Sequence, residues 1–421
     1  MRPAARLQII AELLPLALSE RQPADRLVQK WGRQNRYAGS KDRRDISNRL
    51  FAILRHYGNL TARLEGDTPL LVTMLATHLF TDTPLDEVVA LADGSQYAPK
   101  PISESDAKTL AQAAAETPAE RADKLSVPVW LFDDIEAQMG DETEAVLTAM
   151  LDRAPLDVRV NLLKADRMTA QAALFEDKIE TAPHPKVETA LRVSGTAQII
   201  MSRAYKAGLV EVQDAGAQAV AQICAAQPFE TVMDFCAGAG GKSLAIAAQM
   251  RNKGRLLVHD AIASRMKHLA GRARRAGVEI IESVAPHDLR GLEGQCDLVV
   301  ADVPCSGTGR WRRAPETKWR LNEEGLANLR ELQAQILRQA AALLSPDGRL
   351  AYVTCSLLSS ENDWQVDKFL DQNKAFEVLS SDGPCGYQAR HIFHPCNADT
   401  DGLYMVVLKR RAGGEGVDFG V

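Results

Sequence analysis

Two cysteines that follow apolar, strand-like runs are the residues with the clearest potential for chemistry. Cys305 lies in LVVADVPCSGTG (298–309), and Cys355 lies in RLAYVTCS (349–356). Open α/β sheets place their reactive groups at the carboxyl ends of strands, so we expect both thiols on one rim of a sheet. The pattern predicts an enzyme that uses a pair of thiols on an electrophilic ring.

A third strand end, TVMDFCAGAGGKS (231–243), is rich in glycine and suits close approach to a cofactor. It fits two nucleotide-binding motifs poorly. A phosphate-binding P-loop needs glycine where Cys236 stands, and a dinucleotide fingerprint needs glycine where Ser243 stands. The interpretation that remains is a loop for S-adenosylmethionine, in which Asp234 holds a polar or cationic group and the backbone curls around the nucleoside at Gly238, Gly240 and Gly241.

Two further carboxylates favour the same cofactor. Asp260 ends the next apolar run, LLVHDA (256–261), about twenty residues downstream, where an acidic side chain can accept both ribose hydroxyls. Asp288, in APHDL (285–289), follows a third predicted strand and is placed to meet the adenine edge. A glycine-rich turn alone is usually only a turn, but the carboxylates at the next two strand ends favour a cofactor site.

Two thiols and a carboxylate could together methylate a pyrimidine. Carbon 5 of cytosine is a poor nucleophile until a thiolate adds at carbon 6, and the carboxyl group of Asp302 near the ring nitrogen could offset the developing charge. A base must then remove the carbon 5 proton so that the thiol can leave. The alternative is that Cys305 and Cys355 are ordinary buried cysteines.

Three segments carry a family resemblance: DFCAGAGGKS (234–243), ADVPCSGTGRWRRAPETKW (301–319) and YVTCSLLSSEN (352–362). Residues 145–410 resemble the Sun/Nop-type (RsmB-like) RNA cytosine-5 methyltransferases, with the motifs in the same order and spacing. The helical front resembles, more faintly, the NusB-like RNA-binding domain of that family. Residues 155–205 are similar to its small RNA-recognition-like insert.

The resemblance implies roles for individual residues. Cys355, in the Thr-Cys motif, is the implied nucleophile, Cys305 assists breakdown of the covalent adduct, and Asp302 contacts the base. The implied cofactor contacts are Cys236, Ala237, Gly238, Ala239, Gly240, Gly241, Lys242, Asp260, Arg265, Asp288 and Asp302. The family loop commonly has Pro and Thr where this chain has Ala239 and Ser243, and we expect these small residues to preserve cofactor binding.

The segment GRWRRAPETKWR (309–320) combines cations with aromatic rings directly after the Pro-Cys motif. Cations neutralise phosphates and flat rings stack on unpaired bases, so we expect this segment to contact RNA. The alternative is a structural loop with packed tryptophans. The predicted RNA-binding residues are Arg310, Trp311, Arg312, Arg313, Lys318, Trp319 and Arg320.

Hydrophobic periodicity divides the chain. We predict an all-helical NusB-like domain over 1–125, linker helices over 126–154 and a small α+β unit over 155–205. Strands and helices alternate from 206 to 411, which predicts a Rossmann-like methyltransferase domain with a mostly parallel sheet covered on both faces. Residues 412–421 are expected to be a flexible tail.

Composition limits the other function classes. The net charge of −5 argues against indiscriminate binding of polyanions, although residues 1–66 hold thirteen Lys/Arg against six Asp/Glu. Seven cysteines without metal-finger spacing predict neither disulfides nor a metal. The amino-terminal segment predicts an amphipathic helix rather than a signal peptide. No apolar stretch approaches the length that is needed to span a bilayer. We expect a monomeric cytoplasmic protein that binds structured RNA.

We expect methylation of carbon 5 of cytosine in RNA with S-adenosylmethionine as cofactor, and small-subunit ribosomal RNA is the favoured substrate. Transfer RNA is an alternative substrate. DNA cytosine-5 methylation would use the Pro-Cys thiol as nucleophile, and the Thr-Cys motif argues against it. The alternative outside catalysis is an RNA-binding or ribosome-assembly factor that keeps a methyltransferase fold.

Overall fold

The computed structural model describes residues 1–20 and 22–411, which form two compact units. The helical unit contains residues 1–154 and 310–322. The sheet unit contains residues 155–309 and the chain from 323 onward. The tail predicted over 412–421 lies outside the described residues.

The helical unit is built from amphipathic helices, as the apolar spacing predicts. Helices α1, α3 and α4 pack together around a core that includes Leu14, Leu50 and Leu75, all of them fully buried. The helices of this unit are α1 (Pro3–Ser19), α2 (Ala24–Gln34), α3 (Ser40–Leu64), α4 (Pro69–Phe80), α5 (Leu85–Ala90), α6 (Glu104–Ala115), α7 (Arg121–Lys124), α8 (Val129–Met139), η1 (Gly140–Glu142), α9 (Thr143–Ala149) and α15 (Glu316–Arg320).

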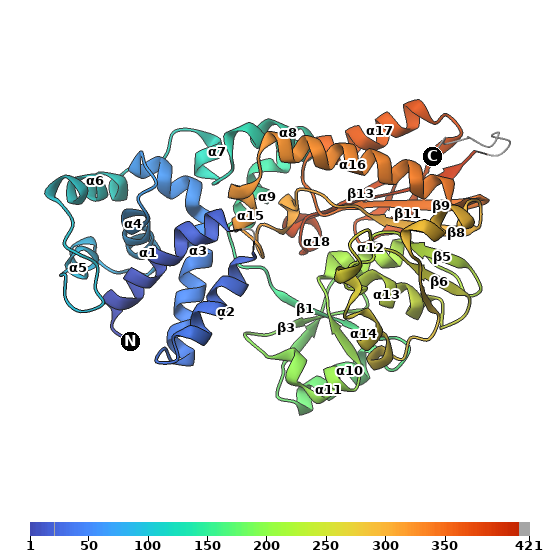
Figure 1. Ribbon diagram of the computed structural model, residues 1–421, viewed down its shortest axis with the longest axis horizontal. Coiled ribbons are helices and arrows are strands. Elements are labelled where there is room, and N and C mark those ends of the chain that lie inside the picture. The colour runs from blue at the N-terminus through green and yellow to red at the C-terminus, as the bar shows by residue number, and fades with distance from the viewer. Residues whose placement is uncertain (21, 412–421) are drawn as a thin grey trace. The chain divides into compact units, whose positions relative to one another are not determined.

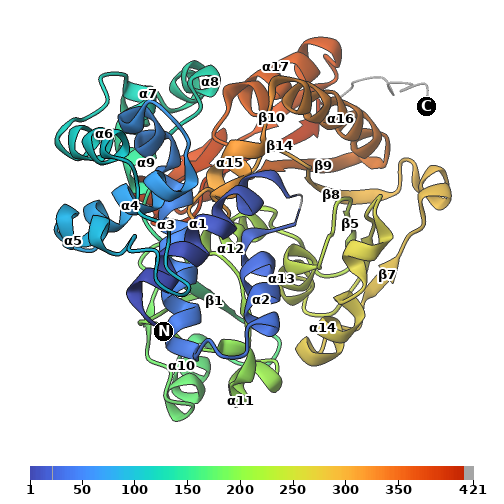
Figure 2. The same cartoon turned by 60° about the vertical axis from the view of Figure 1, so that its left-hand side comes forward.

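Helix α15 comes from late in the chain and yet belongs to this unit, where it lies among the amino-terminal helices (Figures 1 and 2). Lys318 is its most buried side chain, with 1% of its surface exposed. Its Nζ donates to the carbonyl oxygens of Arg55, at 3.3 Å, and Ser126, at 2.8 Å. The ammonium also lies 4.7 Å from the ring centroid of Trp311 and 5.4 Å from that of Trp319.

Backbone contacts fix the same segment along its length. Arg320 Nε donates to the carbonyl oxygen of Ala17 at 3.1 Å, and the backbone N–H of Ala24 donates to Glu316 Oε1 at 3.0 Å. Trp319 Nε1 donates to the carbonyl oxygen of Leu54 at 2.7 Å. Residues 310–322 are therefore an integral part of the helical unit.

The amino-terminal part of the sheet unit is a small antiparallel sheet. Its strand order is β2-β3-β1-β4, and helices α10 and α11 pack on it through a core that includes Val158 and Leu174. The elements are β1 (Leu156–Val160), α10 (Arg167–Glu176), β2 (Thr181–Pro183), β3 (Ala190–Val193), η2 (Ile199–Met201), α11 (Arg203–Lys206) and β4 (Val210–Val212). Strand β4 completes this sheet beyond the boundary that we predicted at residue 205.

The larger sheet has the order β10-β14-β9-β8-β5-β6-β7, and β13 pairs with β14 (Figure 2). Strands β5 to β9 are parallel, β14 runs antiparallel to β9, and β10 and β13 each pair antiparallel with β14. The strands are β5 (Thr231–Asp234), β6 (Arg255–Val258), β7 (Ile281–Ser283), β8 (Cys296–Asp302), β9 (Leu344–Thr354), β10 (Phe376–Leu379), β13 (Arg390–Phe393) and β14 (Leu403–Arg410), and β11 (Ser381–Gly383) pairs separately with β12 (Gly386–Gln388). The mostly parallel Rossmann-like sheet that we predicted is confirmed.

Helices cover both faces of this sheet (Figure 1). For that reason Leu298, Val299 and Val300 of β8 are all fully buried, and the strand is a continuous apolar run instead of an alternating one. The helices are α12 (Ala215–Ile223), α13 (Gly241–Gln249), α14 (Leu269–Ala276), α16 (Glu323–Ala342), α17 (Asp363–Gln372) and α18 (Pro395–Ala398), with the short helices η3 (Ala263–Met266), η4 (Pro286–Leu292), η5 (Thr308–Arg310) and η6 (Ser359–Glu361).

Within the described residues, none of the helices has both the length and the apolar character that crossing a bilayer requires.

Lys318 should make the stability of the helical unit depend on pH. Burial, helped by the charge of Arg55, lowers the pKa of Lys318 from 10.5 to about 7. Between these values the unfolded chain binds a proton that the folded chain does not. The free energy of unfolding should therefore rise with pH across this window, by at most about 1.4 kcal/mol per pH unit.

Urea unfolding of the full chain at pH 7 and pH 9 measures this increment. It should be lost in Lys318→Met and retained in the matched surface control Lys108→Met, because Lys108 is exposed. If Lys318→Met keeps the pH dependence of the unmodified chain, the lysine is charged in the folded state at both pH values.

Candidate active site

The two cysteines singled out from the sequence meet at the rim of the larger sheet. Cys305 follows β8, and Cys355 follows the parallel neighbour β9, where Asp302 is in register with Val353. The two Sγ atoms lie 3.4 Å apart, and both cysteines are half-buried free thiols. A disulfide would require about 2.05 Å, so this is a contact between two reduced sulfurs.

The contact changes the acidity of Cys305. The hydrogen bond with Cys355 raises the pKa of the Cys305 thiol well above its usual value, and burial adds to the effect. The backbone N–H of Cys355 also lies 3.3 Å from Cys305 Sγ and donates to it. Cys305 therefore stays protonated as long as it is hydrogen-bonded to Cys355.

An ion pair joins the glycine-rich loop to the strand that carries the Pro-Cys motif. Lys242 Nζ donates to Asp302 Oδ2 at 2.5 Å. Burial favours the neutral amine of Lys242, but the Asp302 carboxylate outweighs it and raises the pKa of Lys242, and the charge of Cys355 acts in the same direction. Interaction between Lys242 and Cys355 is mutual, so the ammonium favours the thiolate form of Cys355.

The glycine-rich loop that we predicted to bind the cofactor connects β5 with α13. The backbone N–H of Gly238 donates to Asp260 Oδ2 at 3.0 Å, which joins the loop to the carboxylate at the end of β6. Gly238 and Gly240 have φ values of 52° and 79°, in the left-handed region that glycine adopts without strain. A Cβ on Gly240 would lie 2.0 Å from Leu269 Cδ1, so a larger residue there would displace the Leu269 side chain of α14.

Two side chains at the base of the loop are buried. Asp234 Oδ2 accepts a hydrogen bond of 2.6 Å from Ser243 Oγ, and burial raises the pKa of Asp234 to about 6. Asp234 Oδ1 is buried and has no partner among the described residues, which leaves an acceptor free beside the loop. Burial also raises the pKa of Cys236, so that side chain stays a neutral thiol.

The remaining predicted cofactor residues lie further out on the same rim. Arg265 is exposed, with its Nη1 at 4.0 Å from Asp260 Oδ1. Asp288 lies in η4 after β7, is exposed and pairs with His287 at 3.5 Å. The structure thus joins Asp260 to the loop directly, whereas Asp288 lies in the short helix after the neighbouring strand β7.

A buried carboxylate that no sequence pattern indicated supports the Pro-Cys loop. Glu361 in η6 is fully buried, and its Oε1 accepts hydrogen bonds from the backbone N–H of Ser306 at 2.9 Å and from Gln333 Nε2 at 2.8 Å. The hydroxyl of Ser306 donates to Glu361 Oε2. Gln333 Nε2 also donates to the carbonyl oxygen of Pro304 at 3.0 Å. Glu361 and Gln333 therefore hold both residues that flank Cys305.

The chain around Cys355 is fixed in a similar way. The backbone N–H of Gly309 donates to the carbonyl oxygen of Cys355 at 3.0 Å, and the N–H of Gly402 donates to the carbonyl oxygen of Gly309 at 2.8 Å. A Cβ on Gly309 would lie 2.1 Å from the carbonyl oxygen of Gly402, so this approach needs glycine. The two cysteine loops are thereby joined to the segment before β14.

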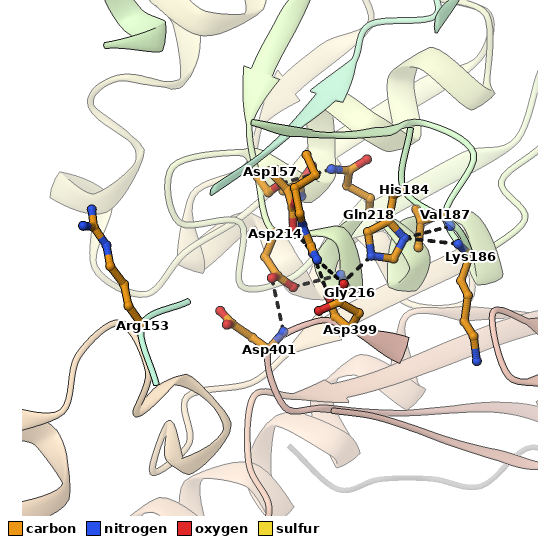
Figure 3. Close-up of polar contacts among 12 residues, drawn as sticks. Arg153, Asp157, His184, Lys186, Val187, Asp214, Gly216, Gln218, Asp399 and Asp401 are labelled. Atoms are coloured by element: carbon orange, nitrogen blue, oxygen red, sulfur yellow. Dashed lines mark hydrogen bonds and ion pairs between the residues drawn. The ribbon is translucent and has the colours of Figure 1, made fainter. Parts of the chain in front are cut away.

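That segment is in turn tied to the small sheet and to α12 (Figure 3). Asp214 caps α12 by accepting from the N–H of Gly216 at 2.8 Å, and it accepts from the N–H of Asp401 at 3.2 Å. His184 Nε2 lies 3.4 Å from the carbonyl oxygen of Asp399. These contacts fix the segment before β14 against the small sheet and α12.

The predicted RNA-binding segment lies mostly inside the helical unit. Trp311, Arg312 and Lys318 have 1%, 7% and 1% of their surface exposed, so packing accounts for these three side chains, as in the alternative of a structural loop. This corrects our expectation for them. Trp319, Arg320 and Arg313 are half-buried, and Arg310 is exposed. The charge pattern could not distinguish a buried cation from a solvent-facing one.

Comparison with known proteins agrees with this geometry. Residues 221–409 match the family described as 16S rRNA methyltransferase RsmB/F, and residues 127–199 match the ferredoxin-like domain of RsmF/B-like methyltransferases. A Synechocystis protein named "Probable ribosomal RNA small subunit methyltransferase B" is 33% identical over 302 residues, which cover 68% of each chain.

The chain belongs to the RsmB/F methyltransferase family.

The ribosomal RNA small subunit methyltransferase B of Vibrio cholerae is 30% identical over 300 residues, covering 70% of this chain and 68% of its own. The crystal structure of PH0851 shares the fold, with a TM-score of 0.76 and 24% identity over 97% of this chain and 99% of its own. The RsmB/F family consists of S-adenosylmethionine-dependent RNA methyltransferases, which confirms the predicted family, fold and cofactor.

Glu361 should be required for the geometry of the Pro-Cys loop in this RsmB/F enzyme. Glu361→Gln keeps the size of the side chain but replaces one acceptor oxygen by a donor, which cannot accept from Ser306 or Gln333. We expect methyl transfer to fall about tenfold or more and the melting temperature to fall by several degrees. Turnover with radiolabelled cofactor and thermal unfolding measure the two effects.

The exposed Glu324→Gln serves as the matched control and should change neither quantity. Wild-type turnover by Glu361→Gln would show that Cys305 is held correctly without this carboxylate.

Proposed function

We propose that this protein methylates carbon 5 of cytosine in RNA, with small-subunit ribosomal RNA as the substrate. The observation that carries the proposal is the 3.4 Å contact between Cys305 and Cys355 on the rim that also holds the glycine-rich loop. The relatives named as ribosomal RNA small subunit methyltransferases support the choice of RNA.

The residues of the loop fit S-adenosylmethionine. Residues 236–242, with Asp260, Arg265, Asp288 and Asp302, would hold the cofactor. The left-handed glycines make room for a backbone cradle, and the free Oδ1 of Asp234 is an acceptor suited to a cationic group. When bound, the cofactor supplies an electrophilic methyl group.

Cys355 is the proposed nucleophile. Its thiolate, favoured by the ammonium of Lys242, adds to carbon 6 of cytosine and forms a C–S bond, which makes carbon 5 nucleophilic. Asp302 lies in ion-pair contact with Lys242 at this rim. Once protonated, its carboxyl group would donate to the ring nitrogen and offset the negative charge that develops there. A methyl group is then accepted at carbon 5, which still carries its hydrogen.

Cys305 is the proposed base for the last step. Its pKa is held high mainly by Cys355, so the conversion of Cys355 into a thioether removes the largest cause of that shift. Cys305 can then ionise and take the carbon 5 proton, after which the C6–S bond breaks and the Cys355 thiolate leaves. The two thiols would therefore act in sequence and not together.

Access to both faces of the ring requires an unpaired or flipped cytosine, which costs a few kcal/mol in a stacked helix. Structured RNA loops are therefore the natural substrates. We propose that the exposed Arg310 contributes to binding of the RNA backbone, since it directly follows the Pro-Cys loop. We also propose a monomer as the active form.

The two cysteine variants should fail in different ways. Cys355→Ala cannot form the C–S bond, so methylation should fall by about three orders of magnitude or more. Cys305→Ala should form the adduct but resolve it slowly, and a covalent protein–RNA complex should accumulate on a denaturing gel. Cys396→Ala, an exposed cysteine, is the matched control and should retain turnover without a trapped complex.

Full turnover by Cys355→Ala would overturn the nucleophile assignment. If the covalent protein–RNA complex accumulates with Cys355→Ala and not with Cys305→Ala, the roles of the two cysteines are reversed. Bisulfite sequencing of total RNA from a deletion strain identifies the substrate. Loss of a modified cytosine in transfer RNA alone would replace ribosomal RNA by transfer RNA. Absence of cofactor binding in calorimetry would instead favour a non-catalytic RNA-binding factor.

A further inference from the structure

Two arginines bind the outer side of the cofactor loop. Arg272 Nη1 donates to the carbonyl oxygen of Ala239 at 2.5 Å, and Arg159 Nη1 donates to the carbonyl oxygen of Gly241 at 2.6 Å. Neither arginine belongs to the loop. Arg272 lies on α14, and Arg159 lies on β1 of the small sheet. The loop is thus held from two elements that contribute none of the proposed cofactor contacts.

Arg272 is itself fixed by a buried carboxylate of the small sheet. Glu211 on β4 is 2% exposed, and its Oε2 lies 3.1 Å from Arg272 Nη2. Arg275, one turn further along α14, pairs with the other oxygen of Glu211 and stacks over Tyr205 at 4.0 Å from the ring centroid. Arg275 shares the carboxylate, but within the described residues its side chain forms no hydrogen bond to the loop.

The small sheet also fixes the end of α14. Asn161 Nδ2 donates to the carbonyl oxygen of Ala276 at 2.8 Å, and Lys164 Nζ donates to that of Arg275 at 2.7 Å. Both acceptors lie in the last turn of α14, where carbonyl groups lack partners within the helix. Leu269, in the first turn, packs against Gly240 of the loop. The position of α14 over the loop is therefore set by residues of the small sheet.

Arg159 is suited to a permanent contact with the loop. It is 5% exposed, and its Nη1 also donates to Gln213 Oε1. Burial lowers the pKa of Arg159 to about 10, which leaves the guanidinium charged at neutral pH. Its bond to Gly241 is therefore charge-assisted and lies in a site from which water is excluded.

These bonds restrict the part of the loop with the greatest conformational freedom. The peptide between Ala239 and Gly240 has its carbonyl bound to Arg272 and its N–H bound to the carbonyl oxygen of Ala237 at 2.8 Å, so both ends of the peptide plane are fixed. Glycine loses more conformational freedom on ordering than other residues do. A loop that is ordered in advance does not incur this cost when the ligand binds.

We propose that Arg272 and Arg159 are positioning residues for the cofactor loop, so that the small sheet sets the affinity for S-adenosylmethionine through them. The inference depends on the proposed assignment of residues 236–242 as the cofactor loop. It gives the small sheet a role in cofactor binding in addition to any contact with RNA.

Calorimetry with S-adenosylmethionine on the full chain tests this. Arg272→Gln should raise the Kd about tenfold, equivalent to about 1.4 kcal/mol, and Arg272→Lys should restore part of the affinity, since it keeps one charged donor. Arg275→Gln is the matched control, because it removes an ion pair to the same Glu211 without a loop contact. It should leave the Kd within about twofold.

One further variant distinguishes failure of the loop assignment from failure of the positioning role. Asp260→Asn tests the loop assignment itself and should weaken cofactor binding. If Asp260→Asn binds normally, the cofactor loop is assigned wrongly. If Asp260→Asn is impaired while Arg272→Gln binds as the unmodified chain does, the positioning role is overturned.

Thermal unfolding and RNA affinity distinguish positioning from general destabilisation. Arg272→Gln and Arg275→Gln should lower the melting temperature to a similar extent and leave RNA affinity unchanged, while only the first changes the Kd for the cofactor. Equal loss of cofactor affinity in both variants would show a purely structural role and would contradict the proposal.

Discussion

Parallel pairing of β5, β8 and β9 is the constraint on which the candidate active site depends. Side by side in one direction, these strands bring three sequence-distant segments to the same rim: the glycine-rich loop, the Pro-Cys motif and the Thr-Cys motif. The apolar β8 is buried on both faces, so its register with β9 cannot shift without exposing its core residues. The short distance between Cys305 and Cys355 follows from that register and from the turns that follow the two strands.

Charge then gives the two sulfurs different properties. Lys242 connects the glycine-rich loop with Asp302 and favours a thiolate at Cys355, while Cys305 is held in its protonated form by its neighbour. Two chemically identical side chains thus lie in different electrostatic surroundings.

The sequence was informative where local patterns decide structure. The apolar runs before Cys305 and Cys355, the glycines of the loop and Asp260 at the next strand end all lie where their patterns indicated. Glu361 and Arg272 could not be found in this way, because their partners are backbone groups brought together only by tertiary packing. For Lys318 the sequence pattern was misleading. A basic, aromatic segment is typical of RNA binding, but carbonyl oxygens and two indole rings surround the Lys318 ammonium inside the helical unit.

Membership of residues 310–322 in the helical unit has a consequence for biosynthesis. The amino-terminal helices emerge from the ribosome long before this segment is translated, so the site for Trp311 and Lys318 stays unfilled while about 150 intervening residues are added. The first unit to be synthesised therefore cannot complete its core before most of the second has been translated. The order of translation and the order of folding differ in this chain, and a fragment ending near residue 154 would lack part of its own interior.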